Sequence, residues 1–290
     1  MQNITVVGAG TMGNGIAHVF GQYGHAVTLV DVRPEALDAA RVTIERNLGR
    51  QVDRDKLTRA EADAALARIA TSTVLAEAVA GADLVVEVAT ENEAVKQRLF
   101  TDIDAAAPSA CVLASNTSSI SITRLAAATN RPAQVIGMHF MNPVPVMRLV
   151  EVIRGYATSD ATAEAIAKLT TAIGKTPVEV SDYPGFVSNR ILMPMINEAI
   201  YTLWQGVAGV EEIDTVMRLG MAHPMGPLHL ADFIGLDVCL SILRVLQEGF
   251  GEAKYAPCPL LVNMVAAGKL GVKTGEGFYF HEGKERRVAR

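Results

Sequence analysis

The sequence predicts an α/β protein in two parts, a doubly wound, mostly parallel sheet and, after it, a smaller all-α domain. Up to about residue 180, short apolar runs alternate with helical stretches, which is typical of a parallel sheet covered on both faces. From about 186 to 270 the pattern is almost wholly helical, with glycine and proline between the helices. The change follows the motif DYPG at 182–185. We therefore expect two domains, 1–183 and 184–290.

Each strand of the first domain is expected at a short apolar run. These runs lie near 3–8, 26–31, 83–88, 111–115, 134–139 and 148–153, and a further strand near 176–180 would close the sheet. Pro143 and Pro145 cannot sit inside a central strand, so residues 140–146 are predicted to form a loop. The segment at about 34–80 is rich in Ala, Arg, Glu and Asp at helical spacing and is too long for a single crossover. It predicts an antiparallel helical hairpin, a helical arm that projects from the sheet.

The start of the chain has the order of a dinucleotide-binding motif. An apolar run at 4–7 leads into Gly8-Ala9-Gly10-Thr11-Met12-Gly13, and an amphipathic stretch follows. Gly8 allows a tight turn, Gly10 lets backbone N–H groups approach a pyrophosphate, and Gly13 lets the helix pack close to the strand. The helix N-terminus then presents unpaired donors to the phosphates. This order predicts a Rossmann-type domain.

Asp31 bears on which dinucleotide binds. It ends the second apolar run, where a carboxylate would hold the ribose hydroxyls of NAD. A carboxylate there would repel the 2′-phosphate of NADP, so NAD is favoured. Arg33 lies two residues further on and could soften that preference.

Composition restricts the possible partners. The net charge is −5 and no basic cluster is present, which argues against nucleic acid and anionic membrane surfaces. The three cysteines (Cys111, Cys239 and Cys258) lie far apart, without the spacing of a disulfide framework or a metal site, which fits a reducing compartment. No signal peptide or apolar span of membrane length is visible. We therefore expect a soluble cytoplasmic protein without a metal.

His139 and Glu151 form the clearest candidate for chemistry. His139 falls at the carboxyl end of an expected strand, the edge where open α/β sheets bind ligands. Glu151 is a lone acid inside the apolar run 149–153. A chain that turns and returns over this distance could bring the carboxylate beside the imidazole, and a buried acid needs such a partner. The pairing would fix the tautomer and make the imidazole a better base.

Other strand ends carry polar residues with two possible roles. The run 115–119 contains small polar residues that can cap a helix, but one hydroxyl there could also hold a substrate oxygen. Glu91 and Lys96 could reach the cofactor, or be an ordinary helix-start acid and a surface lysine. Asn189 lies early in the first helix of the second domain and would face back across a cleft.

The first helix expected in the second domain, from about 186 to 206, is unusually apolar. Ile191 and Leu203 are two of its many large apolar residues. Such a helix in a small domain packs in its core or in a dimer interface, and we expect both, on opposite faces. The sequence therefore favours a homodimer.

These motifs together resemble the 3-hydroxyacyl-CoA dehydrogenase family. The resemblance covers nearly the whole chain and includes VVGAGTMGNGIA, SNTSSIS, GMHFMNPVPVMRLVEV, DYPGFVSNRILMP, HPMGPLHLADFIGLD and GVKTGEGFY. It implies an NAD-dependent oxidoreductase of fatty acid metabolism that interconverts 3-hydroxyacyl-CoA and 3-ketoacyl-CoA.

The resemblance also implies roles for particular residues. His139 would be the catalytic base, Glu151 its orienting partner, and Ser118 and Asn189 hydrogen-bonding groups around the reacting oxygen. The NAD contacts would come from Gly8, Gly10, Thr11, Met12, Gly13, Asp31, Glu91, Lys96, Asn142 and Lys273. The helical arm would bind coenzyme A, and Asn47 and Arg54 stand where related enzymes can offer Ser and Lys.

Three alternatives remain open. The same fold could act on a hydroxy acid without CoA, such as gulonate or carnitine. The chain could be a non-catalytic NAD-binding protein, although an intact His139–Glu151 pair argues against this. It could also belong to a larger fatty-oxidation assembly, which would need a separate partner chain.

Overall fold

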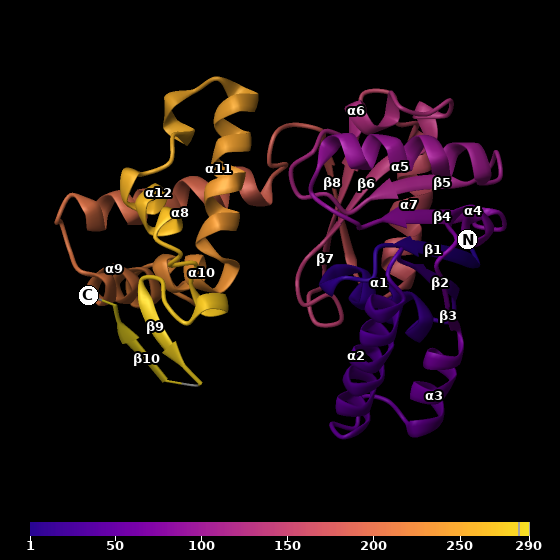
Figure 1. Ribbon diagram of the computed structural model, residues 1–290, viewed down its shortest axis with the longest axis horizontal. Coiled ribbons are helices and arrows are strands. Elements are labelled where there is room, and N and C mark those ends of the chain that lie inside the picture. Colours follow the sequence, from indigo (N-terminus) through magenta and orange to yellow (C-terminus); the bar gives the residue numbers. More distant parts are fainter. Residues whose placement is uncertain (284, 290) are drawn as a thin grey trace. The chain divides into compact units, whose positions relative to one another are not determined.

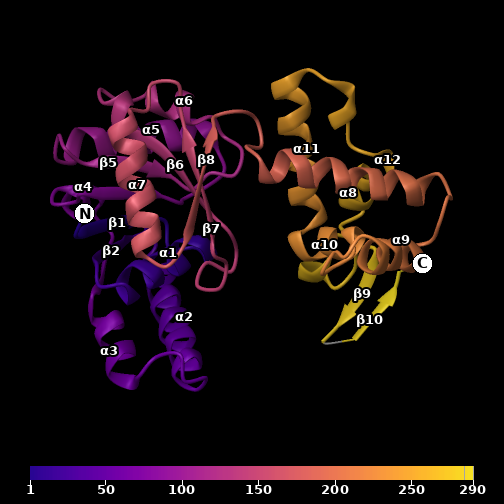
Figure 2. The same ribbon diagram turned by 180° about the vertical axis from the view of Figure 1, so that it is seen from behind.

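The computed structural model describes residues 1–283 and 285–289, and the chain divides into two compact units, Met1–Tyr183 and Pro184–Arg290. The first unit is a sheet with helices on both faces, and the second is mainly helical (Figures 1 and 2). The Rossmann-like sheet and the helical domain after it confirm the predicted fold class.

The first unit contains one eight-stranded sheet in the order β3-β2-β1-β4-β5-β6-β7-β8. Its strands are β1 (Asn3–Val7), β2 (Ala26–Val30), β3 (Ile69–Ser72), β4 (Leu84–Glu87), β5 (Val112–Ser115), β6 (Val135–Phe140), β7 (Leu149–Arg154) and β8 (Thr176–Ser181). Neighbouring strands run parallel, except that β7 is antiparallel to β6. The loop at 141–148 reverses the chain there, as Pro143 and Pro145 predict.

Helices cover both faces of this sheet. They are α1 (Thr11–Gln22), α2 (Pro34–Val52), α3 (Arg59–Ala67), α4 (Leu75–Val79), α5 (Glu93–Ala106), α6 (Ile122–Ala126), the short helix η1 (Pro132–Gln134) and α7 (Asp160–Ala172). In the two views, α5 and α6 lie on one face and α7 on the other (Figures 1 and 2). Ile16 and Phe20 of α1 belong to the same buried cluster as Ile166 of α7, which places α1 on the α7 side.

The helical arm consists of α2 and α3. Leu37, Ala40, Ile44 and Leu48 of α2 are buried in the core cluster, which explains why this charged helix stays attached to the domain. Thr58 begins α3 with a capping box, in which its hydroxyl accepts from Glu61 N at 3.2 Å and its own N–H donates to Glu61 Oε2 at 2.8 Å.

The arm is shorter than the sequence predicted. It ends at Ala67 instead of about residue 80, because residues 69–72 form β3 and 75–79 form α4. Strand β3 pairs in parallel with β2 at the edge of the sheet. Only Ile69 of its four residues is buried, so the segment lacks the apolar run by which the other strands were predicted.

The second unit is built around its own core. Its helices are α8 (Ser188–Trp204), α9 (Val210–Thr215), η2 (Val216–Gly220), α10 (Pro227–Ile234), α11 (Leu236–Phe250), η3 (Ala253–Tyr255), α12 (Pro259–Ala266) and η4 (Val272–Thr274). Met193 and Ile200 of α8 pack with Leu243 of α11 in this core. One addition was not predicted: β9 (Tyr279–Glu282) and β10 (Glu285–Val288) form an antiparallel pair, so the domain is helical but not purely so.

No helix within residues 1–283 and 285–289 is both long and apolar enough to span a membrane. Cys111, Cys239 and Cys258 are buried free thiols.

Candidate active site

The glycine loop after β1 is built so that two of its residues must be glycine. Gly8 has φ +113°, and a Cβ there would stand 2.8 Å from the Val88 carbonyl oxygen. A Cβ on Gly13 would stand 1.8 Å from the Gly8 carbonyl oxygen. A Cβ on Gly10, in contrast, would meet nothing within 4 Å. The first two glycines permit the tight turn and the close helix, while the backbone at Gly10 is open to a ligand.

The N-terminus of α1 has no side-chain cap. Gly10 occupies the capping position, and the first turn contains no acidic residue. The N–H groups of this turn therefore keep their affinity for an anion, and Thr11 beside them is exposed. Together with the open backbone at Gly10, this set of residues fits the pyrophosphate of a dinucleotide.

Asp31 lies directly beside this loop, at the end of β2. Its Oδ2 accepts the N–H of Ala9 at 2.9 Å, and its Oδ1 accepts the N–H of Arg33 at 3.0 Å. The Arg33 Nε atom is 3.6 Å from Asp31 Oδ1, on a largely exposed side chain. Asp31 thus fixes the loop and presents a carboxylate at its edge, with one cation next to it.

His139 and Glu151 contact each other, as the sequence predicts. The two residues are cross-strand partners in the β6–β7 pair, and His139 Nδ1 is 2.8 Å from Glu151 Oε2. Both side chains are almost fully buried. An ionised carboxylate only accepts hydrogen bonds, so Nδ1 donates and Nε2 is the ring nitrogen that carries the lone pair. The arrangement can accept a proton at Nε2 and stabilise the resulting imidazolium.

Asn116 fixes the strand end that carries His139, a role that the sequence analysis missed. Its side-chain Oδ1 accepts the backbone N–H of Phe140 at 2.8 Å, in a buried position. The backbone pairing of β5 with β6 ends at Ser115 and Gly137, so the Asn116 side chain connects the two segments beyond the end of that pairing. The sequence pattern that could have indicated this role is an asparagine directly after an apolar strand.

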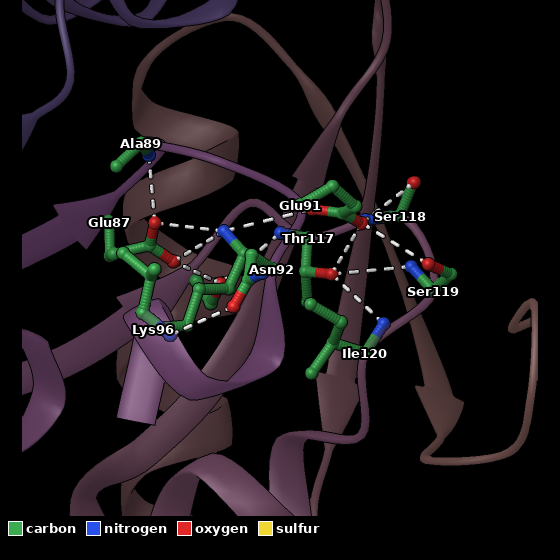
Figure 3. A network of polar contacts seen from close by, with 11 residues as sticks. Glu87, Ala89, Glu91, Asn92, Lys96, Thr117, Ser118, Ser119 and Ile120 are labelled. Atoms are coloured by element: carbon green, nitrogen blue, oxygen red, sulfur yellow. Dashed lines mark hydrogen bonds and ion pairs between the residues drawn. The ribbon is translucent and has the colours of Figure 1, made fainter. Parts of the chain in front are cut away.

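Glu87 is the second residue that the sequence analysis missed, and it explains where Lys96 lies. Lys96 Nζ is 2.8 and 2.7 Å from the two carboxylate oxygens of Glu87, and both side chains are buried (Figure 3). Lys96 is therefore not the surface lysine that was one of its two possible roles. Glu87 could have been singled out in the same way as Glu151, because it is an acid at the end of the apolar run 84–86.

Glu91 gathers the polar residues that follow β5. Its Oε1 accepts from Thr117 Oγ1 at 2.7 Å, from Ser118 N at 2.8 Å and from Ser118 Oγ at 3.0 Å (Figure 3). Partial burial alone would raise the pKa of Glu91, but the charge of Lys96 and these hydrogen bonds outweigh it and hold that pKa below its usual value. The structure thus brings Glu91, Lys96 and Ser118 into one network.

The loop between β6 and β7 carries Asn142, which is exposed. A buried cation holds this loop: Lys175 Nζ donates to the carbonyl oxygens of Val144 and Met147, at 2.7 Å each. Burial lowers the pKa of Lys175. Lys175 was not singled out from the sequence, since nothing in its local pattern marks it.

The remaining predicted residues belong to other segments of the chain. Asn47 is in the last part of α2, and Arg54 is exposed in the turn between α2 and α3. Asn189 is the second residue of α8 and is buried, and Lys273 lies in η4, where its Nζ is 2.6 Å from Asp237 Oδ2. The last two belong to the second unit.

Comparison with known proteins assigns a family to both parts of the chain. The model of the 3-hydroxyacyl-CoA dehydrogenase NAD binding domain matches residues 3–183, and the model of the 3-hydroxyacyl-CoA dehydrogenase C-terminal domain matches residues 185–281.

Individual relatives agree over nearly the full length. A probable 3-hydroxybutyryl-CoA dehydrogenase of Bacillus subtilis is 55% identical over 284 residues, covering 98% of this chain and 99% of the relative. A 3-hydroxybutyryl-CoA dehydrogenase of Bradyrhizobium diazoefficiens is 54% identical, over 98% of this chain and 96% of that protein. The crystal structure of (S)-3-hydroxybutyryl-CoA dehydrogenase from Ralstonia eutropha matches with a TM-score of 0.94 at 49% identity, covering 97% of this chain and 99% of that one. The resemblance stated from the motifs is confirmed, and the chain belongs to the 3-hydroxyacyl-CoA dehydrogenase family.

Proposed function

We propose that this protein is an NAD-dependent dehydrogenase that interconverts (S)-3-hydroxyacyl-CoA and 3-ketoacyl-CoA, with 3-hydroxybutyryl-CoA and acetoacetyl-CoA as its pair of substrates. One observation carries the proposal. In a chain of this family, His139 Nδ1 lies 2.8 Å from Glu151 Oε2 at the carboxyl-end edge of a sheet that has a glycine loop for a dinucleotide.

His139 moves the proton in this proposal. In oxidation its Nε2 takes the proton of the 3-hydroxyl group, and Glu151 stabilises the imidazolium that forms, because it is an anion bonded to the opposite ring nitrogen. In reduction the same imidazolium returns the proton to the oxygen. Ser118 and Asn189 are assigned to hold that oxygen by hydrogen bonds.

NAD, when bound, supplies the acceptor or donor of hydride. The loop residues Gly8, Gly10, Thr11, Met12 and Gly13 are assigned to hold its pyrophosphate. Asp31 is assigned to the ribose hydroxyls, which favours NAD over NADP because its carboxylate would repel a 2′-phosphate.

Further cofactor contacts are assigned to Glu91, Lys96, Asn142 and Lys273. Glu91 and Lys96 belong to the polar network at the end of β4 and β5, which supports their place beside the dinucleotide loop. Asn142 lies in the loop that leaves the strand of His139.

Coenzyme A is assigned to the helical arm. Arg54 is exposed in the turn at the end of α2, and its guanidinium can hold a phosphate with two parallel hydrogen bonds. Asn47 lies on α2, about two turns before it.

We also propose a cytoplasmic homodimer that forms through the second unit. Large apolar side chains of this unit are exposed, among them Ile191 of α8 at 66% and Phe233 of α10 at 57%. Exposed residues of this kind in a mainly helical domain are typical of an interface between copies. Light scattering would detect the dimer.

An assay of NADH absorbance with acetoacetyl-CoA tests the proposed reaction. We expect oxidation of NADH, slower oxidation of NADPH, and little activity with free hydroxy acids such as gulonate and carnitine when NAD is the oxidant. Failure with every 3-ketoacyl-CoA would overturn the proposal, and activity with a free acid alone would favour a substrate without CoA.

A further inference from the structure

Glu87 is completely buried at the end of the central strand β4, and four donor contacts converge on its carboxylate. Lys96 Nζ contacts both oxygens, Ala89 N donates to Oε1 at 2.7 Å, and Ser115 Oγ donates to Oε2 at 2.7 Å (Figure 3). A buried ammonium needs such an anion, because transfer of an unpaired charge out of water is strongly unfavourable.

A second carboxylate competes for the same ammonium. Glu91 Oε2 is 3.7 Å from Lys96 Nζ, a full ångström further away than Glu87 Oε2 at 2.7 Å. Coulomb attraction grows as distance falls, so Lys96 would draw Glu91 inward if Glu87 lost its charge. With Glu87 ionised, the charge of Lys96 is already balanced, and Glu91 can direct its other oxygen elsewhere.

That other oxygen organises the turn that follows β5. Glu91 Oε1 accepts from Thr117 Oγ1, Ser118 N and Ser118 Oγ, and Thr117 Oγ1 in turn accepts the N–H of Ile120 at 2.9 Å (Figure 3). Ser118 N–H thus depends on this carboxylate oxygen directly, and Ser119 N–H and Ile120 N–H depend on it through the Thr117 hydroxyl. An inward movement of Glu91 would break its hydrogen bonds to this turn, including those to Ser118.

Glu87, the partner of Lys96, also lies next to the dinucleotide loop. Glu87 is the register partner of Val7 on one side and of Ser115 on the other. The chain directly after it, at Val88 and Ala89, packs against Gly8 so closely that a Cβ on Gly8 would stand 2.9 Å from Ala89 N. Glu87 thus lies in one row of the sheet between the loop for the cofactor and the turn that carries Ser118.

We propose that Glu87 is a positioning residue of the active site: by neutralising Lys96 it leaves Glu91 in place to hold the Thr117–Ile120 turn, and thereby Ser118. Glu87 itself is sealed from solvent, so its side chain offers no exposed surface to a substrate or cofactor. The expected effect of Glu87 on turnover rests on the proposed function, whereas its control of the Thr117–Ile120 turn does not.

Hydrogen–deuterium exchange of the full-length protein, without ligand, tests the control of the turn. In Glu87→Gln, the peptide that covers 117–120 should exchange about tenfold faster, the order of effect expected from one lost hydrogen bond. The matched control is Asp104→Asn on α5, the helix that also carries Lys96. Asp104 is also a buried acid, paired with Arg131 Nε at 2.5 Å near the other end of α5. That variant should lose stability but leave exchange at 117–120 unchanged.

Two further measurements connect the turn to the site. Fluorescence titration with NADH should show weaker binding in Glu87→Gln than in Asp104→Asn. Turnover of acetoacetyl-CoA should fall about tenfold to a hundredfold, as expected when a reacting group is displaced by about an ångström. Unchanged exchange at 117–120 in Glu87→Gln, or an equal increase in Asp104→Asn, would overturn the proposal.

Glu87→Asp keeps the test decisive if the glutamine variant does not fold. Aspartate keeps the negative charge but holds it one methylene further from Lys96. Exchange at 117–120 should therefore rise less than in Glu87→Gln and more than in Asp104→Asn. Wild-type exchange in a folded Glu87→Asp protein, with its carboxylate withdrawn, would contradict the proposal. A wild-type protein without dehydrogenase activity would overturn only the proposed function, since exchange is measured without substrate.

Discussion

His139 and Glu151 face each other across the single antiparallel strand pair of the eight-stranded sheet, with His139 Nδ1 2.8 Å from Glu151 Oε2. In an antiparallel pair, directly opposed residues place their side chains on the same face and within reach of each other. The reversal of β7 therefore delivers an acid to the histidine at the edge where ligands bind, and a parallel β7 would have changed that register.

His139→Gln tests the proton transfer. Glutamine keeps a polar side chain of similar size but cannot take up a proton, so turnover of acetoacetyl-CoA should fall by about 10² to 10⁴. NADH binding, measured by fluorescence titration, should stay near the wild-type level, because the glycine loop is unchanged. Near-normal turnover in this variant would remove His139 from the proposed role.

Asp31→Ala tests the choice of cofactor. The substitution removes both the anion at the ribose position and the acceptor of Ala9 N, so NAD should bind more weakly and the preference for NAD over NADP should narrow. The ratio of kcat/KM for NADH and NADPH measures this. An unchanged ratio would indicate that Arg33 or other residues set the preference.

Arg54→Ala tests the helical arm. If Arg54 holds a phosphate of coenzyme A remote from the reacting carbon, KM for acetoacetyl-CoA should rise about tenfold while kcat changes little, because a uniform binding contact is lost. Lys168→Ala removes an exposed cation of α7, outside the arm, and serves as control. Equal effects of the two substitutions would argue against a specific phosphate contact at Arg54.

His18 should make the first unit sensitive to acid. Burial lowers its pKa to about 4 from the usual 6.5, with the charge of Lys175 lowering it further and a hydrogen bond with Gln22 acting in the opposite direction. Between these two values the unfolded chain binds a proton that the folded chain excludes. The free energy of unfolding should therefore fall as pH decreases from 6.5 towards 4, by up to about 1.4 kcal/mol per pH unit.

Urea unfolding at several pH values measures this dependence. His18→Gln removes the titrating group and keeps a polar side chain that can bond to Gln22 and Gln51. In that variant the slope between pH 6.5 and 4 should be smaller by about one proton. The same slope in both proteins would show that His18 does not control acid sensitivity.

Much of the fold could be read from local patterns. Six of the eight sheet strands follow apolar runs, and the glycine loop follows the first of them, because burial of both faces of a sheet imposes such runs on the sequence. The edge strand β8, which has no fully buried residue, was expected as the strand that closes the sheet. Strand β3 and the β9–β10 pair escaped prediction. In β3 one residue of four is buried, and a short edge strand draws its stability from its neighbour instead of from its own apolar residues.

Some residues of the candidate site could likewise be predicted from local patterns, and others could not. His139 and Glu151 could be singled out because each is a polar residue in an apolar stretch, and their spacing allowed a turn between them. Glu87 gave the same signal, an acid after Leu84-Val85-Val86, but its meaning depends on Lys96, which lies on a helix and carries no distinguishing local pattern. Asn116 and Lys175 likewise act on backbone atoms of distant segments.

The sequence by itself determined the dinucleotide loop, the carboxylate at Asp31 and the histidine at a strand end, because glycine geometry and strand periodicity are local properties. Only the tertiary structure decided which charges meet. It brought the expected pair of Glu151 and His139 into contact through strand register, it buried Lys96 against Glu87, and it set Glu91 against the turn of Ser118. Such pairs depend on the alignment of segments far apart in the chain, and desolvation makes their charge balance obligatory once they are buried.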